Sequence, residues 1–143
     1  MKDIIFVGKQ GAGKTTLIQK LINEKLEYKK TQAVEYYPNI IDTPGEYLEN
    51  PRYYNAIITL SFDANLVALV HDSTSSENFF PPGFGAMFNK KVVGIITKID
   101  HKDSDVKRSE DWLKNAGATH IYMVSSYTNE GIEQISRLFS KQI

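Results

Sequence analysis

Two patterns of apolar and polar positions alternate along the chain. The first is the short, nearly continuous apolar run that is typical of strands buried on both faces of a parallel sheet. The predicted strands lie at residues 4–7, 31–37, 39–42, 66–70, 92–96 and 121–124. Of these, residues 31–37 alternate between polar and apolar positions rather than forming a continuous run.

The second pattern places apolar residues every three to four positions, as on one face of a helix. The apolar residues that follow it are Leu17, Ile18, Leu21 and Ile22; Tyr54, Ile57, Ile58 and Phe62; Val106, Trp112 and Leu113; and Ile132, Ile135, Leu138 and Phe139. Helix starts are expected at Asn50 with Pro51 in the first helical position, and at Ser104 or Asp105 as a cap. The last helix is expected to begin at Asn129 or Glu130.

Strands that alternate with helices predict an α/β fold with three layers, in which a mainly parallel sheet carries helices on both faces. The 143 residues suit a single domain over residues 1–143. Ligands of such sheets bind beyond the carboxyl ends of the strands. Four polar segments follow strand ends, at residues 8–16, 42–46, 97–100 and 125–126. We therefore expect these segments to meet at one edge of the sheet.

The charge balance excludes some classes of partner. Seventeen Lys and Arg residues balance seventeen Asp and Glu residues, which leaves no basic surface that would predict binding to nucleic acid or to an anionic membrane. The chain has no cysteine, no signal-peptide pattern, and no apolar run near the about 18 residues of a spanning helix. A cytoplasmic protein is the expectation.

Residues 8–15 match the phosphate-binding pattern G-x-x-x-x-G-K-[ST], with a strand before and a helix after, as that motif requires. Glycine backbone can curl its N–H groups around an anion, and the first turn of the helix favours negative charge. Lys14 would contact the β and γ phosphates, and the Thr15 hydroxyl would ligate Mg²⁺. The candidate nucleotide-binding residues here are Gly8, Gln10, Gly11, Ala12, Gly13, Lys14, Thr15 and Thr16.

The other polar segments extend this hypothesis. Asp42 and Gly45 fit a D-x-x-G element, in which the carboxylate holds Mg²⁺ and the glycine N–H contacts the γ phosphate. Residues 97–100 fit [NT]-K-x-D, in which Asp100 would accept two hydrogen bonds from the Watson–Crick edge of guanine. The remaining candidate base-binding residues are Thr97, Lys98, Ser125 and Ser126. Each segment alone also fits an ordinary turn.

The order of these motifs resembles that of small GTPases of the phosphate-loop NTPase class. A narrower resemblance is to the EutP/PduV family of ethanolamine and propanediol utilization. It is carried by residues 8–16, 30–36 (Lys-Thr-Gln-Ala-Val-Glu-Tyr), 42–47, 80–84 (Phe-Pro-Pro-Gly-Phe) and 94–100. The resemblance implies a GTPase-like protein of bacterial amine or diol catabolism, beside a protein-shelled microcompartment. A shell protein or an activating protein is then a candidate partner.

Several roles stay open at this stage. Thr31 is either a third Mg²⁺ ligand from the first switch or a strand-entry threonine. Glu46 stands where small GTPases commonly carry a water-orienting glutamine; with Lys14 it is the candidate catalytic pair, yet it also suits a residue that points to solvent. The phenylalanines at residues 79–88 are either core or a partner surface. We find no arginine placed as a finger, so intrinsic hydrolysis is expected to be slow.

Three functions are compatible with these residues. We favour an Mg²⁺-dependent protein that binds GTP and GDP and hydrolyses GTP weakly. The first alternative is a phosphotransferase that moves the γ phosphoryl group of ATP or GTP to a small carboxylic acid, with Glu46 or His71 near the acceptor. The second is a scaffold that binds nucleotide with negligible turnover and docks through its phenylalanine-rich segment.

Overall fold

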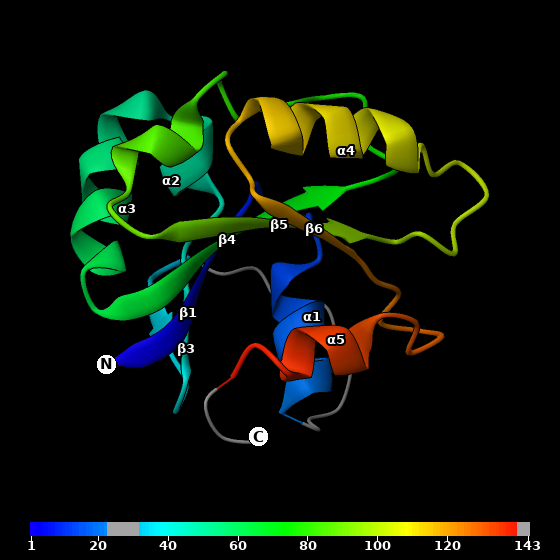
Figure 1. The fold of residues 1–143 in the computed structure, drawn as a ribbon, viewed down its shortest axis with the longest axis horizontal. Coiled ribbons are helices and arrows are strands. Elements are labelled where there is room, and N and C mark those ends of the chain that lie inside the picture. Colours follow the sequence, from blue (N-terminus) through cyan, green and yellow to red (C-terminus); the bar gives the residue numbers. More distant parts are fainter. Residues whose placement is uncertain (23–31, 140–143) are drawn as a thin grey trace.

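The computed structural model describes residues 1–22 and 32–139, and this part of the chain forms one six-stranded sheet with helices on both faces (Figure 1). The strands are β1 (Lys2–Val7), β2 (Glu35–Tyr36), β3 (Ile40–Asp42), β4 (Ala64–Asp72), β5 (Lys91–Thr97) and β6 (His120–Met123). Their spatial order is β2-β3-β1-β4-β5-β6. The predicted α/β class is confirmed.

All neighbouring strands are parallel except β2 and β3. In the centre of the sheet, Ile4 of β1 lies opposite Ile40 of β3 on one side and Leu66 of β4 on the other. Glu35 of β2 pairs antiparallel with Asp42 of β3. Because the other strands run the same way, the segments that follow their carboxyl ends lie along one edge of the sheet.

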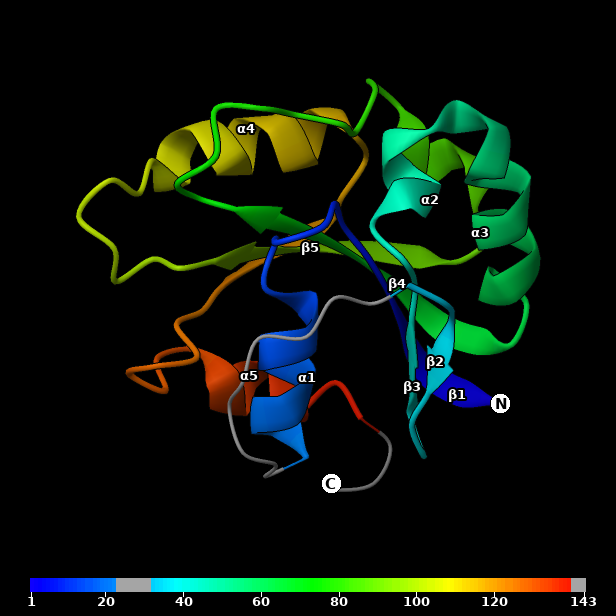
Figure 2. The same ribbon diagram turned by 180° about the vertical axis from the view of Figure 1, so that it is seen from behind.

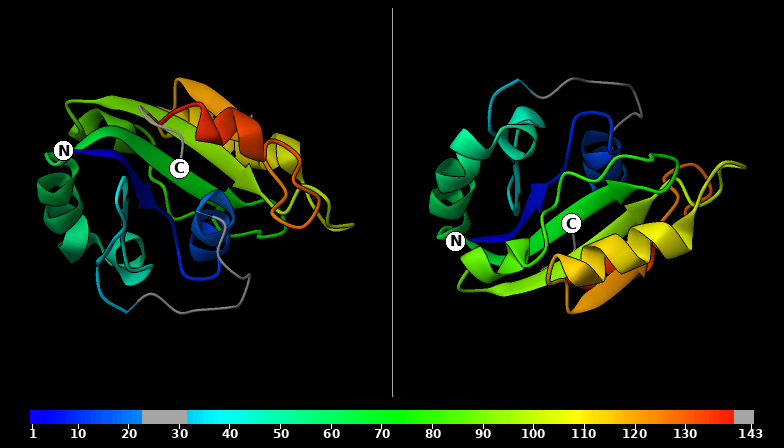
Figure 3. Two further views of the ribbon diagram at one scale, coloured as in Figure 1. Left: turned by 90° about the horizontal axis from the view of Figure 1, so that it is seen from below. Right: turned by 90° about the horizontal axis from the view of Figure 1, so that it is seen from above.

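The helices divide between the two faces of the sheet (Figures 2 and 3). They are α1 (Lys14–Leu21), α2 (Glu46–Glu49), α3 (Tyr54–Ser61), α4 (Val106–Asn115) and α5 (Ile132–Ser136), with 3₁₀ turns η1 (Pro51–Tyr53) and η2 (Phe84–Met87). Side chains of β1 pack alternately on each face. Ile5 and Val7 pack in the core beneath α2, α3 and α4. Ile4 and Phe6 pack on the opposite face in the core beneath α1 and α5.

The segment predicted as a strand at residues 31–37 is extended only at Glu35–Tyr36 within the described residues, and Thr31 lies outside them. Phe62 does not join the face of α3 but is 59% exposed, because α3 ends at Ser61. The last helix begins at Ile132, after Gly131 in the left-handed conformation with φ of 76°. The helix was expected to begin at Asn129 or Glu130, but these residues lie in the loop that ends at Gly131.

A short helix, α2, begins at Glu46, the last residue of the predicted turn at residues 43–46. The Tyr47 N–H donates to the Pro44 carbonyl at 3.0 Å, and the backbone of Gly45 is already helical. Leu48 is its one buried residue. A single buried apolar side chain leaves no periodic pattern, which explains why the sequence did not predict this helix.

The phenylalanine-rich segment belongs to the core. Phe80, Phe84 and Phe88 are buried, and their rings meet edge to face, with centroids 5.7 Å apart for the first pair and 5.5 Å for the second. This confirms the core interpretation and removes most of the surface through which a scaffold was expected to dock. Among the described residues, no helix is long and apolar enough to span a membrane.

Candidate functional site

The loop between β1 and α1 has the backbone that its glycines predict. Gly11 and Gly13 have positive φ, 82° and 94°, a conformation that other residues rarely adopt. A Cβ atom on Gly8 would lie 2.7 Å from the Val70 carbonyl oxygen. The loop therefore curls tightly against the carboxyl end of β4, and α1 starts directly after it at Lys14.

Lys14 turns back into this loop. Its buried Nζ donates to the carbonyl oxygens of Gly8 at 2.8 Å and Lys9 at 3.3 Å. Burial lowers the pKa of Lys14 below its ordinary value, whereas the nearby charges of Asp42 and Glu49 act to raise it. The ammonium group is thus held where an anion bound by the loop would meet it.

Thr15 and Asp42 meet beside the loop. The Thr15 hydroxyl donates to Asp42 Oδ2 at 3.1 Å, and the Asp42 carboxyl group is fully buried at the end of β3. A hydroxyl and a carboxylate are the hard oxygen ligands that suit Mg²⁺. Among residues 1–22 and 32–139, no three His, Asp or Glu side chains converge on a metal position. An Mg²⁺ ion held by this pair would take its remaining ligands from phosphate and water.

The end of β5 is joined to the same loop. The buried Thr97 hydroxyl donates to the Ala12 carbonyl oxygen at 2.6 Å. Lys98 Nζ donates to the Gly11 carbonyl oxygen at 3.1 Å and forms an ion pair with Asp72 Oδ2 at 2.7 Å. Burial alone would raise the pKa of Asp72, but hydrogen bonds from Lys98 and Thr74 lower it overall.

Lys98 has a φ of 61°, which is uncommon for a residue other than glycine. Sparsely populated backbone conformations of this kind concentrate at functional sites. The two hydrogen bonds of its ammonium group hold the side chain along the loop. Sequence reasoning did not find Asp72 as the partner of Lys98, because only the parallel pairing of β4 and β5 places the two side by side.

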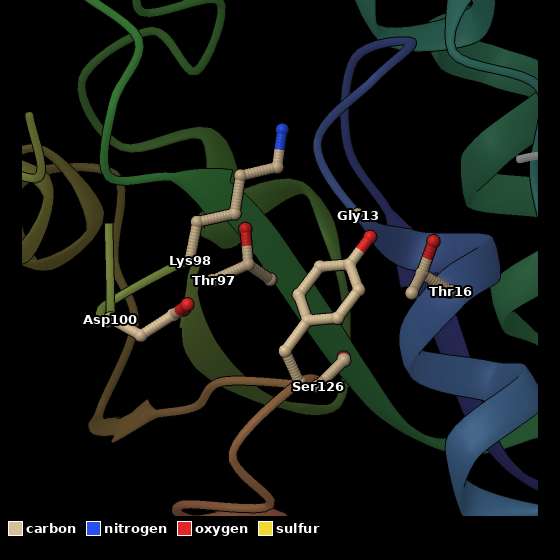
Figure 4. Close-up of a pocket in the computed structure, with 7 residues that line it drawn as sticks. Gly13, Thr16, Thr97, Lys98, Asp100 and Ser126 are labelled. Atoms are coloured by element: carbon tan, nitrogen blue, oxygen red, sulfur yellow. The ribbon is translucent and has the colours of Figure 1, made fainter. Parts of the chain in front are cut away.

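A pocket joins three of the four predicted segments. Its lining consists of Gly13, Thr16, Thr97, Lys98, Asp100, Ser126 and Tyr127. Figure 4 shows Thr97, Lys98 and Asp100 on the opposite side of the pocket from Gly13, which precedes α1, and Thr16 of α1, with Ser126 below them. The fourth segment adjoins through the contact of Asp42 with Thr15. The predicted meeting of distant loops at one edge is therefore present in the structure.

The loop after β6 contributes differently from what the sequence indicated. Ser125 is buried: its N–H donates to the Glu130 carbonyl oxygen at 2.9 Å, and its hydroxyl accepts from the Thr128 N–H at 3.1 Å. It shapes the loop, whereas Ser126, the other predicted serine, lines the pocket. Tyr127 also lines the pocket and is 77% exposed, a feature that sequence reasoning missed although the residue adjoins Ser126.

The helix α2 rests against the phosphate-binding loop. A Cβ atom on Gly45 would overlap the backbone nitrogen of Gln10, so the two segments are in direct contact. Glu49, at the other end of α2, accepts a hydrogen bond from the Gln10 N–H at 3.0 Å. Glu46 is the exposed first residue of the helix.

His71 does not reach the pocket. It is buried in β4, with Nδ1 2.8 Å from the Ser109 hydroxyl and Nε2 2.9 Å from the Glu77 carbonyl oxygen. Both ring nitrogens are therefore engaged inside the protein. The hypothesis that His71 lies near an acceptor is wrong, because the ring is enclosed beneath α4, where Trp112 packs edge to face at 5.3 Å between centroids.

Comparison with known proteins places this site in context. Residues 1–141 match the model of the PduV-EutP family, described as ethanolamine utilisation and propanediol utilisation. The chain is 38% identical to the propanediol utilization protein PduV of Citrobacter freundii over 136 residues, which cover 94% of this chain and 91% of that protein. It is 36% identical to the probable acetate kinase EutP of Escherichia coli (strain K12) over 138 residues, 94% of this chain and 87% of that protein.

A more distant similarity is to the GTPase Era of Haemophilus influenzae (strain PittGG). The two are 23% identical over 163 residues, which cover 98% of this chain and 54% of that protein. This similarity agrees with the mostly parallel sheet and the phosphate-binding loop described above.

Proposed function

The chain belongs to the PduV-EutP family of ethanolamine and propanediol utilisation, and from this premise we propose that it is an Mg²⁺-dependent protein that binds GTP and GDP and hydrolyses GTP slowly. One observation carries the proposal. Lys98 and Asp100 line one pocket with Gly13 and Thr16, next to the Thr15–Asp42 pair. A nucleotide whose base lies between these groups has its phosphates at the amide-rich loop.

The proposed position of the phosphates is supported by the groups that lie at the loop. Lys14 would contact the β and γ phosphates, and amides of the loop would donate to their oxygens. Thr15 and Asp42 would hold Mg²⁺, which neutralises phosphate charge when bound. The contact of Gly45 with Gln10 at the phosphate-binding loop supports the proposal that the D-x-x-G element contacts a γ phosphate.

The base end is supported by Asp100. An ionised carboxylate accepts but does not donate, so it matches the two adjacent donors of guanine, whereas adenine presents one donor beside an acceptor. Asp100 is exposed at the pocket, where a bound base would meet it. Thr97 holds this segment to the loop through the Ala12 carbonyl. Of the two predicted serines, Ser126 lines the pocket and is the one proposed to face the base.

Slow hydrolysis is inferred from the position of Arg52. Arg52 is exposed and lies over the ring of Tyr53, 5.2 Å from its centroid, so it is not directed at the loop. An arginine finger typically adds about 10³ to 10⁵ in rate, which a partner would have to supply. Glu46 remains a candidate base or water-orienting residue. We expect the protein to act in the cytoplasm beside a microcompartment, where a shell protein or an activator is the candidate partner.

Calorimetric titration with GTP, GDP and ATP tests the proposal, with and without Mg²⁺. GTP and GDP should bind more tightly than ATP, and Lys14→Ala should abolish binding of all three. Asp100→Ala should weaken the binding of GTP by about 10- to 100-fold, because hydrogen bonds to a charged group contribute about that much affinity, and should leave the binding of ATP nearly unchanged. ATP binding as tight as GTP binding, with no effect of Asp100→Ala, contradicts the guanine assignment.

A second candidate function rests on the name of a relative. The 36% identical protein of Escherichia coli is described as a probable acetate kinase. In that reaction a carboxylate oxygen attacks the γ phosphorus, the bond to the β phosphate oxygen breaks, and the nucleoside diphosphate leaves. The same cradle would hold the donor, and Glu46 rather than His71 would lie near the acceptor.

The two candidates differ in one measurable product. In the same titration series, GTP or ATP is supplied with acetate, and acetyl phosphate is measured beside inorganic phosphate. Acetyl phosphate formation that depends on acetate and disappears in Lys14→Ala supports the phosphotransferase. Slow release of inorganic phosphate, unchanged by acetate, supports the GTPase.

A further inference from the structure

The carboxylate of Glu49 occupies the open end of the phosphate-binding loop. Its Oε2 accepts from the Gln10 N–H at 3.0 Å, although Glu49 lies 39 positions further along the chain and its side chain is exposed to solvent. Backbone N–H groups of such loops are the donors that bind phosphate oxygens. A glutamate side chain is therefore bound where a phosphate oxygen is expected.

The position of Gln10 in the loop indicates which phosphate of a nucleotide would reach its N–H group. The pocket that would take the base is at Gly13 and Thr16, on the α1 side of the loop. Gln10 stands at the other side, against Gly45, whose added Cβ would overlap the Gln10 nitrogen. A phosphate chain that starts at the pocket and passes Lys14 reaches Gln10 last.

We propose that Glu49 takes the place of the terminal phosphate and makes the site discriminate against nucleoside triphosphates in favour of diphosphates. This inference rests on the proposed function and adds to it a residue that determines specificity for phosphate number. A diphosphate leaves the Gln10 N–H to Glu49. A triphosphate must displace the carboxylate, because two anions at one donor repel each other.

Two further observations support this position for the carboxylate. The charge of Glu49 acts on Lys14, the residue that would contact the terminal phosphates, together with the charge of Asp42. Glu49 also belongs to the same short helix that Gly45 begins, so its displacement would remove one of the contacts between α2 and the loop.

The test uses Glu49→Gln, which removes the charge and keeps nearly the same shape. Glu133→Gln is the matched control, since it changes net charge equally on α5, where Glu133 pairs with Arg137 at 3.0 Å. Wild type and both variants are titrated with GTP, GDP, ATP and ADP in excess Mg²⁺. Circular dichroism confirms that each variant is folded.

Glu49→Gln should strengthen binding of both triphosphates by about five- to tenfold, as expected for loss of an exposed charge repulsion, and should change diphosphate binding less than about twofold. Glu133→Gln should change neither. An unchanged ratio of triphosphate to diphosphate affinity, in a protein that binds nucleotides through Lys14, overturns this inference alone. A wild type that binds no nucleotide overturns the proposed function and this inference with it.

Discussion

At the scale of single residues, short polar contacts hold the loop to the sheet and leave a few side chains directed outward. Thr97 and Lys98 are engaged with carbonyl groups of the loop, at Ala12 and Gly11. Tyr127 has no such constraint and exposes 77% of its surface at the rim of the pocket. An exposed aromatic ring beside a polar pocket is suited to stacking on a purine, because every base has an aromatic face.

We therefore expect Tyr127→Ala to weaken the binding of both GTP and ATP by about tenfold, within the range measured for base stacking on aromatic side chains. The protein's stability should not change, because the ring is exposed. Fluorescence titration with a labelled nucleotide measures this effect. Tyr36→Ala, which removes a ring 59% exposed on β2, is the control and should leave affinity unchanged. A loss confined to GTP would assign Tyr127 to base recognition instead of stacking.

At the scale of elements, long apolar segments were predictable and short ones were not. Residues 66–70 and 92–96 were identified as strands because burial on both faces leaves continuous apolar runs, and β4 and β5 contain them. The helix α2 escaped prediction because it depends on packing against the loop. The motif residues of the site were predicted because they follow one another in recognisable sequence patterns. Asp72 and Glu49 were not predicted, because only tertiary packing brings them into contact with those residues.

Gly45→Ala tests the packing of α2. The φ of −58° suits alanine, so the backbone itself is not strained. The new Cβ would overlap the nitrogen of Gln10, and relief of that overlap requires the helix to move. We expect the free energy of unfolding to fall by about 1–3 kcal/mol, the usual effect of overpacking, measured by urea denaturation. Faster hydrogen exchange at the Gln10 N–H would locate the change, and unaltered exchange there would contradict it.

At the scale of the whole molecule, His71 links the sheet to the helix α4 that covers it. Its ring bridges β4, Ser109 of α4 and the carbonyl of Glu77 in the following loop. Burial lowers the pKa of His71 below its ordinary 6.5, opposed by the hydrogen bond to Glu77 and the charge of Asp72. The folded protein therefore holds the ring neutral in conditions where the unfolded chain protonates it.

This difference predicts a dependence of stability on pH. The unfolded chain binds the extra proton below about pH 6.5, so the stabilisation is complete above that value and is lost as the pH falls toward the lowered pKa of His71. The midpoint of urea denaturation should be lower at pH 5.5 than at pH 7.5. His71→Gln should flatten this dependence relative to His120→Gln, which changes an exposed ring. Equal slopes in the two variants would assign the effect to other groups.

The two ends of the phosphate-binding loop lie beside separate parts of the chain. Asp100 stands at the Gly13 end, on the segment after β5, whereas Glu49 stands at the Gln10 end, on α2. No side chain is shared between the two contacts. Under the two proposals above, a substitution at Asp100 would alter the choice between guanine and adenine without altering the choice between triphosphate and diphosphate, and a substitution at Glu49 would do the reverse.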